Sequence, residues 1–264
     1  MFLSTAIVSF ASFGILVDGA PTKAGFSQEC TDITLKDDWL VANCPTGEDD
    51  TTRIQSSVYL SSKITNSEAY LGWKMDGAYA NSCSKCQIIN GATLNCMCNH
   101  SWNAKENTTL NLEEHISNYN GHLLSDLAGP PSPPSSSSPT PMPADLSWAL
   151  HYGNVSCYSP TSDRCKDIPF GPGKTCQASP SVTSKTTPST CFTFRVPIAG
   201  EIWENFQSMK ATSPGKGYEF VFYDDLQCTG EPISSIKPEE LGVCKEFPKL
   251  GVGVKVKPLW NADV

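Results

Sequence analysis

Short apolar stretches separated by turn residues run through the chain, and this pattern predicts strands rather than long helices. The clearest case is 87–95, where two apolar stretches flank Asn90-Gly91. Asn-Gly accepts positive φ at both central positions of a type I′ turn, so this segment predicts a β-hairpin. Later in the chain, 191–196, 218–223 and 252–257 are apolar or alternating at strand length. We expect 199–209 to be a short helix or irregular.

The first half of the chain contains an internal repeat. Residues 56–71 align with residues 108–123 at a shift of 52 positions, and Cys44 falls near Cys98 at a shift of 54. Two copies of a unit of roughly 50 residues predict a pseudo-symmetric module. The matched positions are Leu60 with Leu112, Ile64 with Ile116, Asn66 with Asn118, and Leu71 with Leu123.

A segment rich in Pro and Ser divides the chain. Residues 129–143 read GPPSPPSSSSPTPMP, in which twelve of fifteen residues are Pro or Ser. Such a segment has little to bury and tends towards extended polyproline geometry. It predicts a linker at 129–145, between a first module at 25–128 and a second module at 146–264.

The apolar run from Phe2 to Val17 predicts an export signal. It is short for a bilayer span and small residues follow it, so we assign a signal peptide to residues 1–19, with cleavage as late as residue 24. The alternative is a buried strand or helix. No second apolar stretch reaches membrane length, so we expect a secreted, extracellular protein without a membrane span.

Charge and cysteine content narrow the class of protein. The formal net charge of −8 argues against a nucleic-acid partner, because phosphate binding favours a Lys/Arg face. Twelve cysteines divide into six before residue 129 and six after residue 145. In an exported protein such numbers indicate disulfides within each module. A zinc site at Cys83, Cys86, Cys96 and Cys98 is the alternative, although C-x-C is not the usual second half of such a site.

The hairpin register bears on how the first six cysteines pair. Pairing about Asn90-Gly91 places Cys83 opposite Cys98, whereas Cys86 and Cys96 are one residue out of step. Both bridges therefore require a β-bulge that absorbs one residue. The predicted pairs are Cys83–Cys98, Cys86–Cys96 and, by elimination, Cys30–Cys44. For the second module we expect three bridges, and all fifteen connectivities stay open.

We find no catalytic motif in the chain: it has no G-x-S-x-G elbow, no H-E-x-x-H and no Gly-rich phosphate loop. Neutral polar residues instead occupy turns, as in Asn118-Tyr-Asn-Gly121 and its repeat mate Asn66-Ser-Glu-Ala69. Side chains of this kind supply the paired donors and acceptors that sugar hydroxyls need. A plain turn explains the same residues, since Asn and Gly tolerate positive φ. We expect neither a metal site nor a cofactor.

Several motifs of the first module resemble the cyanovirin-N homology (CVNH) family of fungal type. They are Gly25-Phe-Ser-Gln-Glu-Cys30, Leu40-x-Ala-x-Cys44, Leu71-x-Trp73, Ser82-Cys83 and the segment Asn111–Leu123, NLEEHISNYNGHL. The similarity covers about residues 25–124. The extra pair Cys86/Cys96 resembles a variation seen in fungal members of the family. The resemblance implies an all-β, pseudo-symmetric lectin with two sugar sites that bind mannose-rich glycans without metal. The second module is expected to be a small disulfide-rich β fold.

The resemblance implies two sugar sites, carried over residue by residue. Tyr119 and Asn120 differ from the family turn, Pro45 replaces a polar residue, and Ala69 stands where the second turn normally has Gly. Site 1 consists of Gly25, Gln28, Glu29, Pro45, Thr46, Gly47, Asn118, Tyr119 and Asn120. Site 2 consists of Thr65, Asn66, Glu68, Asn81, Ser82, Asn99 and His100.

Three N-glycosylation sequons begin at Asn99, Asn107 and Asn154. A glycan on Asn99 would lie at site 2 and fill it. We therefore expect site 1 to be the working site and site 2 to be weak or blocked.

Together these patterns predict a secreted, non-enzymatic lectin whose partners are mannose-rich oligosaccharides or glycoproteins. We expect a monomer or a domain-swapped dimer. One alternative is a secreted interaction or effector protein whose function lies in the second module, with decayed lectin sites. Another is an enzyme in the second module that acts on cell-wall polymer, although we find no paired catalytic carboxylates there.

Overall fold

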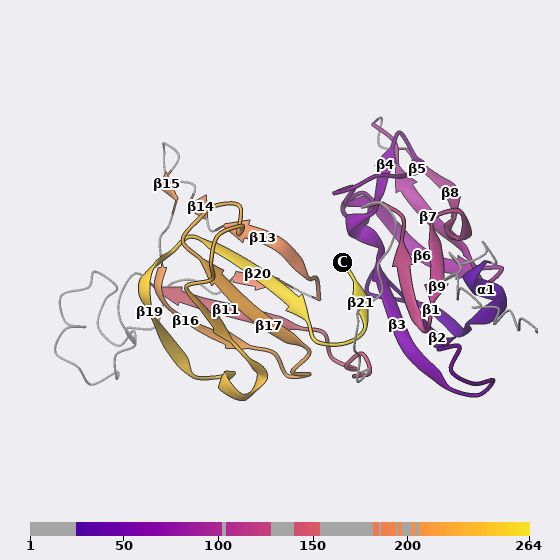
Figure 1. Ribbon diagram of the computed structural model, residues 1–264. Helices are drawn as coiled ribbons and strands as arrows, with labels where there is room; N and C mark the ends of the chain where they lie inside the picture. The colour runs from indigo at the N-terminus through magenta and orange to yellow at the C-terminus, as the bar shows by residue number, and fades with distance from the viewer. Residues whose placement is uncertain are drawn as a thin grey trace, which may run out of the picture.

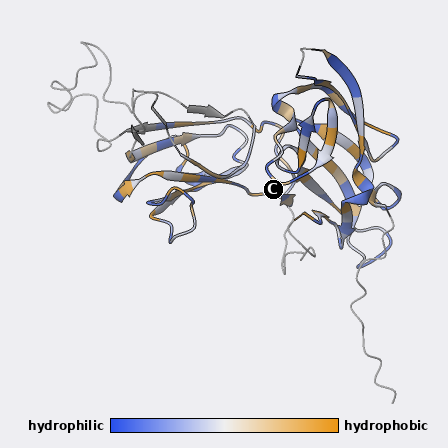
Figure 2. Ribbon diagram, turned by 90° about the horizontal axis from the view of Figure 1, so that it is seen from above, coloured by the Kyte–Doolittle hydropathy of each residue, from blue (hydrophilic) through white to orange (hydrophobic). Residues whose placement is uncertain are grey.

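The computed structural model describes residues 25–101, 104–127, 140–153, 182–184, 186–193, 195–196, 202–203 and 206–264. The predicted signal peptide, residues 129–139 of the predicted linker and Cys157, Cys165 and Cys176 lie outside these residues. Figure 1 shows two β-rich modules side by side, with the C-terminal end of the chain between them. In both modules hydrophobic and hydrophilic positions are interspersed along the strands (Figure 2), as expected for strands with one buried face.

The first module has two halves of matching order. Each half combines a short helix, three antiparallel strands, a 3-10 turn and a two-stranded hairpin. The first half comprises α1 (Phe26–Glu29), β1 (Thr31–Lys36), β2 (Trp39–Pro45), β3 (Arg53–Tyr59), η1 (Leu60–Ser62), β4 (Ile64–Ser67) and β5 (Tyr70–Trp73). The second comprises η2 (Tyr79–Asn81), β6 (Cys83–Ile89), β7 (Thr93–Asn99), β8 (Lys105–Asn111), η3 (Leu112–Glu114), β9 (Ile116–Tyr119) and β10 (His122–Ser125).

The two halves confirm the predicted repeat, because matched residues open matched elements. Leu60 and Leu112 begin η1 and η3, and Ile64 and Ile116 begin β4 and β9. All four side chains are fully buried in one core with Phe26. Burying each is worth about 1.5–3 kcal/mol, so the repeat positions hold the two halves together.

The β6–β7 hairpin forms with the predicted bulge, but the expected two-residue turn is wrong by one residue, because Ile89 pairs with Thr93 and leaves residues 90–92 in the connection. Its register places Cys83 opposite Cys98 and shifts between Ser84 and Gln87. Lys85 lies inside this shift with a φ of 53°, which re-aims the strand between the two cysteines. The bridges in the first module are Cys30–Cys44, Cys83–Cys98 and Cys86–Cys96, the pairs expected from the sequence.

The second module is a β-sandwich of two four-stranded sheets. Their orders are β12-β11-β16-β19 and β13-β20-β17-β18. Aromatic rings fill the space between the sheets, with Phe222 at 4.6 Å from Phe247 and 5.9 Å from Phe206. The described elements are β11 (Trp148–Gly153), β12 (Val182–Ser184), β13 (Ser189–Thr193), β14 (Arg195–Val196), β15 (Ile202–Trp203), β16 (Phe206–Thr212), β17 (Tyr218–Tyr223), β18 (Ser234–Ile236), η5 (Pro238–Glu240), β19 (Cys244–Gly251), β20 (Gly253–Pro258) and β21 (Ala262–Asp263).

The sequence prediction for the second module is right for three strands and wrong for one segment. The first expected strand forms as two, β13 and β14, and the other two form as β17 and β20. The expectation of a helix or irregular backbone at 199–209 is wrong, because β15 and the start of β16 lie there. A register shift between Phe206 and Ser208 lets Phe206 and Met209 both face the core, which hides the strand period in the sequence.

Among the described cysteines of the second module, Cys191 is bonded to Cys228, and Cys244 is also disulfide-bonded. The bridge packs against Val221 and Tyr223, outside the main core.

The two modules share an apolar core. Trp39 and Tyr59 of the first module belong to the same buried cluster as Trp148, Phe220 and the other core residues of the sandwich. The end of the predicted linker also packs on the first module, since Lys36 Nζ donates to the carbonyls of Pro143 and Ala144 at 2.9 and 2.8 Å. Residues 140–145 are therefore part of an interface rather than a free spacer.

Candidate functional site

Site 1 is formed where three separate segments meet. They are α1 with Gly25 before it, the turn that follows β2, and the turn between β9 and β10. Asn118 ties them together: its Nδ2 donates to Glu29 Oε2 at 2.9 Å and to the Pro45 carbonyl at 3.1 Å. Its Oδ1 accepts from the Gly121 N–H at 2.8 Å. Since the amide of Asn118 is engaged on both sides, its role is to hold the site rather than to contact a ligand.

The β9–β10 turn has the conformation that its Asn-Gly sequence favours. Asn120 and Gly121 have φ values of 52° and 88°, as a type I′ turn requires. Glycine is also needed sterically, because a Cβ on Gly121 would lie 2.5 Å from Ile54 Cγ1. The turn thus packs directly against β3, and Asn120 projects beyond it as an exposed side chain.

The turn after β2 is held by its own hydrogen bonds. The Thr46 N–H donates to the Thr52 carbonyl at 3.0 Å. Within the turn, the Asp49 carboxylate accepts from the backbone N–H and hydroxyl groups of Thr51 and Thr52. These bonds, led by the one from the Thr52 hydroxyl, hold the pKa of Asp49 well below its usual range. Gly47 faces the other turn, since a Cβ there would lie 3.6 Å from Asn120 Oδ1.

Two side chains outside the predicted set hold α1 in place. Glu113 Oε1 accepts from the Ser27 N–H at 3.0 Å, and its Oε2 fills the space where a Cβ on Gly25 would lie. Arg53 Nη1 donates to the Glu29 carbonyl at 2.8 Å. Sequence reasoning missed both residues, because Glu113 reads as repeat surface and no local motif marks Arg53.

The side chains of site 1 that remain accessible to a ligand are neutral and polar. Gln28 and Asn120 are exposed, and Tyr119 is half-buried, which raises the pKa of its hydroxyl. These groups lie beside the Glu29 carboxylate and the backbone of the two turns. Such a set can hydrogen-bond to several neighbouring hydroxyl groups of one ligand. All nine predicted residues of site 1 lie on the three converging segments.

Site 2 also assembles, from the β4–β5 turn, η2 and the end of β7. Asn66 Nδ2 donates to Ser82 Oγ and to the Asn99 carbonyl, both at 2.9 Å. Asn66 Oδ1 is buried and has no hydrogen-bond partner among the described residues. Its counterpart in site 1, Asn118 Oδ1, accepts from a turn N–H, so the two sites differ at this atom.

The β4–β5 turn keeps its shape without glycine. Glu68 and Ala69 have φ values of 53° and 64°, both in the left-handed region. This conformation costs about 1–2 kcal/mol at Ala69, whose repeat mate in site 1 is Gly121. Glu68 Oε2 accepts from the Ser101 hydroxyl at 2.7 Å and N–H at 3.1 Å, and lies 2.9 Å from His100 Nδ1. These contacts, led by the Ser101 hydroxyl, lower the pKa of Glu68. Much of its bonding capacity is therefore used inside the protein.

Thr65 and Asn81 complete the predicted set of site 2. Thr65 lies on β4 and is bridged to Ala78, and Asn81 lies on η2 beside Ser82. Of the sequons, Asn99 is exposed at the end of β7 and Asn107 is exposed on β8. Asn154 lies outside the described residues.

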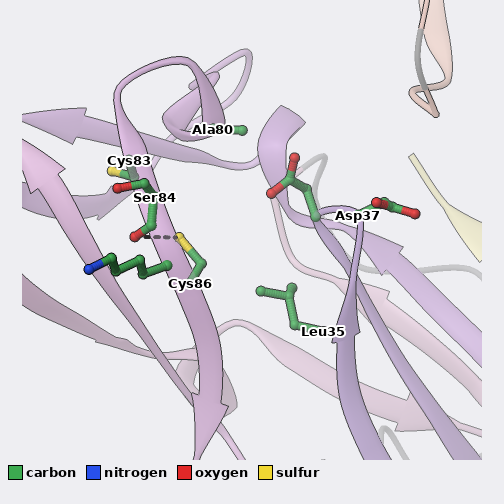
Figure 3. Close-up of a pocket in the computed structure, with 8 residues that line it drawn as sticks. Leu35, Asp37, Ala80, Cys83, Ser84 and Cys86 are labelled. Atoms are coloured by element: carbon green, nitrogen blue, oxygen red, sulfur yellow. Dashed lines mark hydrogen bonds between the residues drawn. The ribbon is translucent and has the colours of Figure 1, made fainter.

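A hollow of about 240 Å³ lies apart from both sites, between the β1–β2 turn and the bulge of β6 (Figure 3). Tyr79 donates to Asp38 Oδ1 at 3.1 Å, while burial raises the pKa of Asp38. None of the predicted sugar-site residues lines this hollow. Its lining residues are Leu35, Asp37, Asp38, Ala80, Cys83, Ser84, Lys85 and Cys86.

Within the part of the chain that the structure describes, no three His, Cys, Asp or Glu side chains come together as metal ligands. No helix in the described ranges is long and apolar enough to cross a bilayer.

Comparison with known proteins gives the first module a family. The CVNH domain model matches residues 26–124.

Among solved structures, GzCVNH of Gibberella zeae is 24% identical and covers 38% of this chain and 95% of its own, with a TM-score of 0.34. TbCVNH of T. borchii is 23% identical and covers 38% and 98%, with a TM-score of 0.35. Microvirin, solved as a complex with mannobiose, is 24% identical and covers 38% and 95%, with a TM-score of 0.33. No curated protein matches this chain in sequence. Residues 26–124 of this chain are a CVNH domain.

Proposed function

We propose that this chain is a secreted lectin that binds mannose-rich glycans at site 1 by hydrogen bonding, without catalysis. The convergence of α1 and the two turns around Asn118 carries the proposal. Hydrogen bonds of Asn118, Glu113 and Arg53 hold these segments in place. Gln28 and Asn120 face solvent. A neutral polar surface that is already ordered suits a sugar, which offers several hydroxyl groups and no charge.

The expected sugar affinities of the two sites differ because their side chains are engaged to different degrees by hydrogen bonds within the protein. At site 1 the exposed amides of Gln28 and Asn120 have no hydrogen-bond partner within the described part of the chain. At site 2 Glu68 is engaged by Ser101, and a glycan on Asn99 would stand beside it. We therefore propose site 1 as the main site and site 2 as the weaker one.

A single shallow site supports only weak binding, about millimolar to micromolar in dissociation constant. Useful strength on a glycan-rich surface then requires several sites at once. Site 2, a second copy of the chain through domain swapping, or the second module are candidates for the further contact. Secretion is part of the proposal and rests on the signal-like residues 1–19, the sequons and the disulfides.

The test is an NMR titration of the full chain, produced without N-glycans, against an α1,2-linked mannose disaccharide. We expect shifts around Gln28, Thr46 and Asn118–Asn120. Asn120→Ala should weaken binding roughly tenfold by removing one ligand contact. Gln87→Ala, which removes an exposed amide from β6, is the matched control and should have no effect.

Two outcomes would change the proposal. Shifts with a tetramer of N-acetylglucosamine but not with the mannose disaccharide would keep a lectin and overturn its mannose specificity. No shifts with either sugar at millimolar concentration would overturn the lectin proposal and move the search to the second module.

A further inference from the structure

A short segment at the end of the second module returns to the first. Trp260 is buried between Trp39 and Tyr218, with ring centroids 5.2 Å from each, and its Nε1 donates to Ser57 Oγ at 2.9 Å. Beyond it, β21 pairs in parallel with β3, with Ala262 beside Ser57. Figure 1 shows β21 alongside β3, on the side of the first module that faces the second.

Asn261 lies in this segment, directly against the β9–β10 turn of site 1. Its Nδ2 donates to the Gly121 carbonyl and to the Gln55 carbonyl, both at 3.3 Å. Its Oδ1 is paired with Nδ1 of the buried His122, and its own carbonyl accepts from the Ser57 N–H at 3.0 Å. One amide side chain thus joins β3 to the turn.

The turn is consequently held from both sides at the same residue. On the site 1 side, the Gly121 N–H donates to Asn118, which in turn bonds to Glu29. On the opposite side, the Gly121 carbonyl accepts from Asn261. A continuous series of hydrogen bonds therefore leads from the last residues of the second module to the carboxylate of Glu29 in α1.

The repeat provides an internal comparison. The repeat mate of His122 is Tyr70, which begins β5 directly after the turn of site 2. His122 is 5% exposed beneath Asn261, whereas Tyr70 is 74% exposed. The added support is therefore specific to the site 1 turn, although the two hairpins otherwise share one design.

We propose that Asn261 is a positioning residue of site 1: it fixes the turn that presents Tyr119 and Asn120, so that the second module sets the sugar affinity of the first. The inference rests on the proposed function of site 1. Ordering the turn before binding removes part of the entropy that the ligand would otherwise have to offset. We expect the effect at site 1, because the side-chain hydrogen bonds of Asn261 go to β3 and to the β9–β10 hairpin.

The test compares two substitutions in the same short segment of the full, unglycosylated chain. Asn261→Asp retains the acceptor for His122 and loses the donor to Gly121. Asp263→Asn leaves the turn contacts intact and alters only the bonds to Lys63 and Ser125. Affinity for the mannose disaccharide is measured from the shifts at site 1, and thermal stability is measured alongside.

We expect Asn261→Asp to weaken site 1 roughly three- to tenfold, the effect of releasing one or two ordered side chains. It should also speed hydrogen exchange of the Gly121 N–H in the absence of sugar. Asp263→Asn should lower stability and leave the affinity unchanged. Equal affinities for the natural chain and Asn261→Asp, with unchanged exchange, would overturn the inference while the lectin proposal stands. A natural chain that binds no sugar would instead overturn both.

Discussion

The Lys63 ammonium lies 3.2 Å from the Asp263 carboxylate, with side-chain exposures of 7% and 18%. Asp263 also accepts from the Ser125 N–H at 2.7 Å. A buried lysine of the first module is thus neutralised by a residue at the end of the second module. The ion pair therefore makes the stability of the CVNH domain depend on a segment outside residues 26–124, which the family model matches.

Removing one partner of this pair should cost more than removing both. Asp263→Asn leaves a buried ammonium without its counter-charge, and we expect a loss of about 3 kcal/mol in the free energy of unfolding. Lys63→Met in the Asp263→Asn background should recover most of that loss. Denaturant unfolding of the four chains forms a double-mutant cycle.

The exposed pair of Lys249 and Asp224 is the matched control for this cycle. Its atoms are 3.4 Å apart and its side chains are 70% and 41% exposed, so we expect a coupling below about 0.5 kcal/mol. Additive effects at Lys63 and Asp263 would contradict the proposed dependence.

Trp260→Ala should uncouple the two modules. The indole fills the space between Trp39 and Tyr218 and donates to Ser57, so its loss should cost about 3–5 kcal/mol. Calorimetry should then show two separate transitions where the natural chain shows one. Leu259→Ala removes a partly exposed neighbour and should leave one transition. Two transitions in the natural chain would show that the shared core does not couple the modules.

Two glycines with positive φ in hairpin turns should respond differently to alanine. At Gly91 (φ 77°) a Cβ would lie 3.3 Å from Ser27 Cβ, so Gly91→Ala should cost about 1 kcal/mol, mainly as backbone strain. At Gly121 it would lie 2.5 Å from Ile54, which adds overpacking of about 1–3 kcal/mol. Thermal unfolding of the two variants measures the difference. Equal losses would mean that the turn of site 1 can shift away from β3.

The contact between Glu68 and Ser101 should depend on pH. Hydrogen bonds from Ser101 hold the pKa of Glu68 below its ordinary value of 4.5. Because the folded pKa is lowered, the contribution of this contact is fully present above about pH 4.5 and is lost as the pH falls through the folded value. The Ser101 amide shift, followed by NMR, should report this transition. Glu68→Gln should abolish it, and an identical transition in that variant would assign it to another group.

The parts of the fold that sequence predicts are those determined by local patterns. The Asn90-Gly91 turn marks the hairpin, and the spacing of its four cysteines requires one bulge, which the structure has at Lys85. The repeat likewise marks core residues, since Leu60 and Leu112 are matched and buried. In each case the partners lie close in the chain or share a period.

The parts that sequence does not predict depend on contacts between distant segments. Asn261 meets Gly121 across the entire second module, and no local pattern marks either as a partner of the other. Glu113 supports α1 in the same way, from the far end of the first module. In β16 the register shift at Phe206 removes the alternation by which a strand is recognised.

The position of β21 has a consequence for the order in which the protein is made. During synthesis the CVNH domain leaves the ribosome first, and the edge of β3 that β21 will cover is then an unpaired strand edge. Trp39, on the neighbouring strand β2, also lacks its later partner, because its ring packs against Trp260. Until the second module has been translated to β21, this nascent chain therefore presents an open edge and an apolar surface, the features that folding chaperones bind and that promote aggregation.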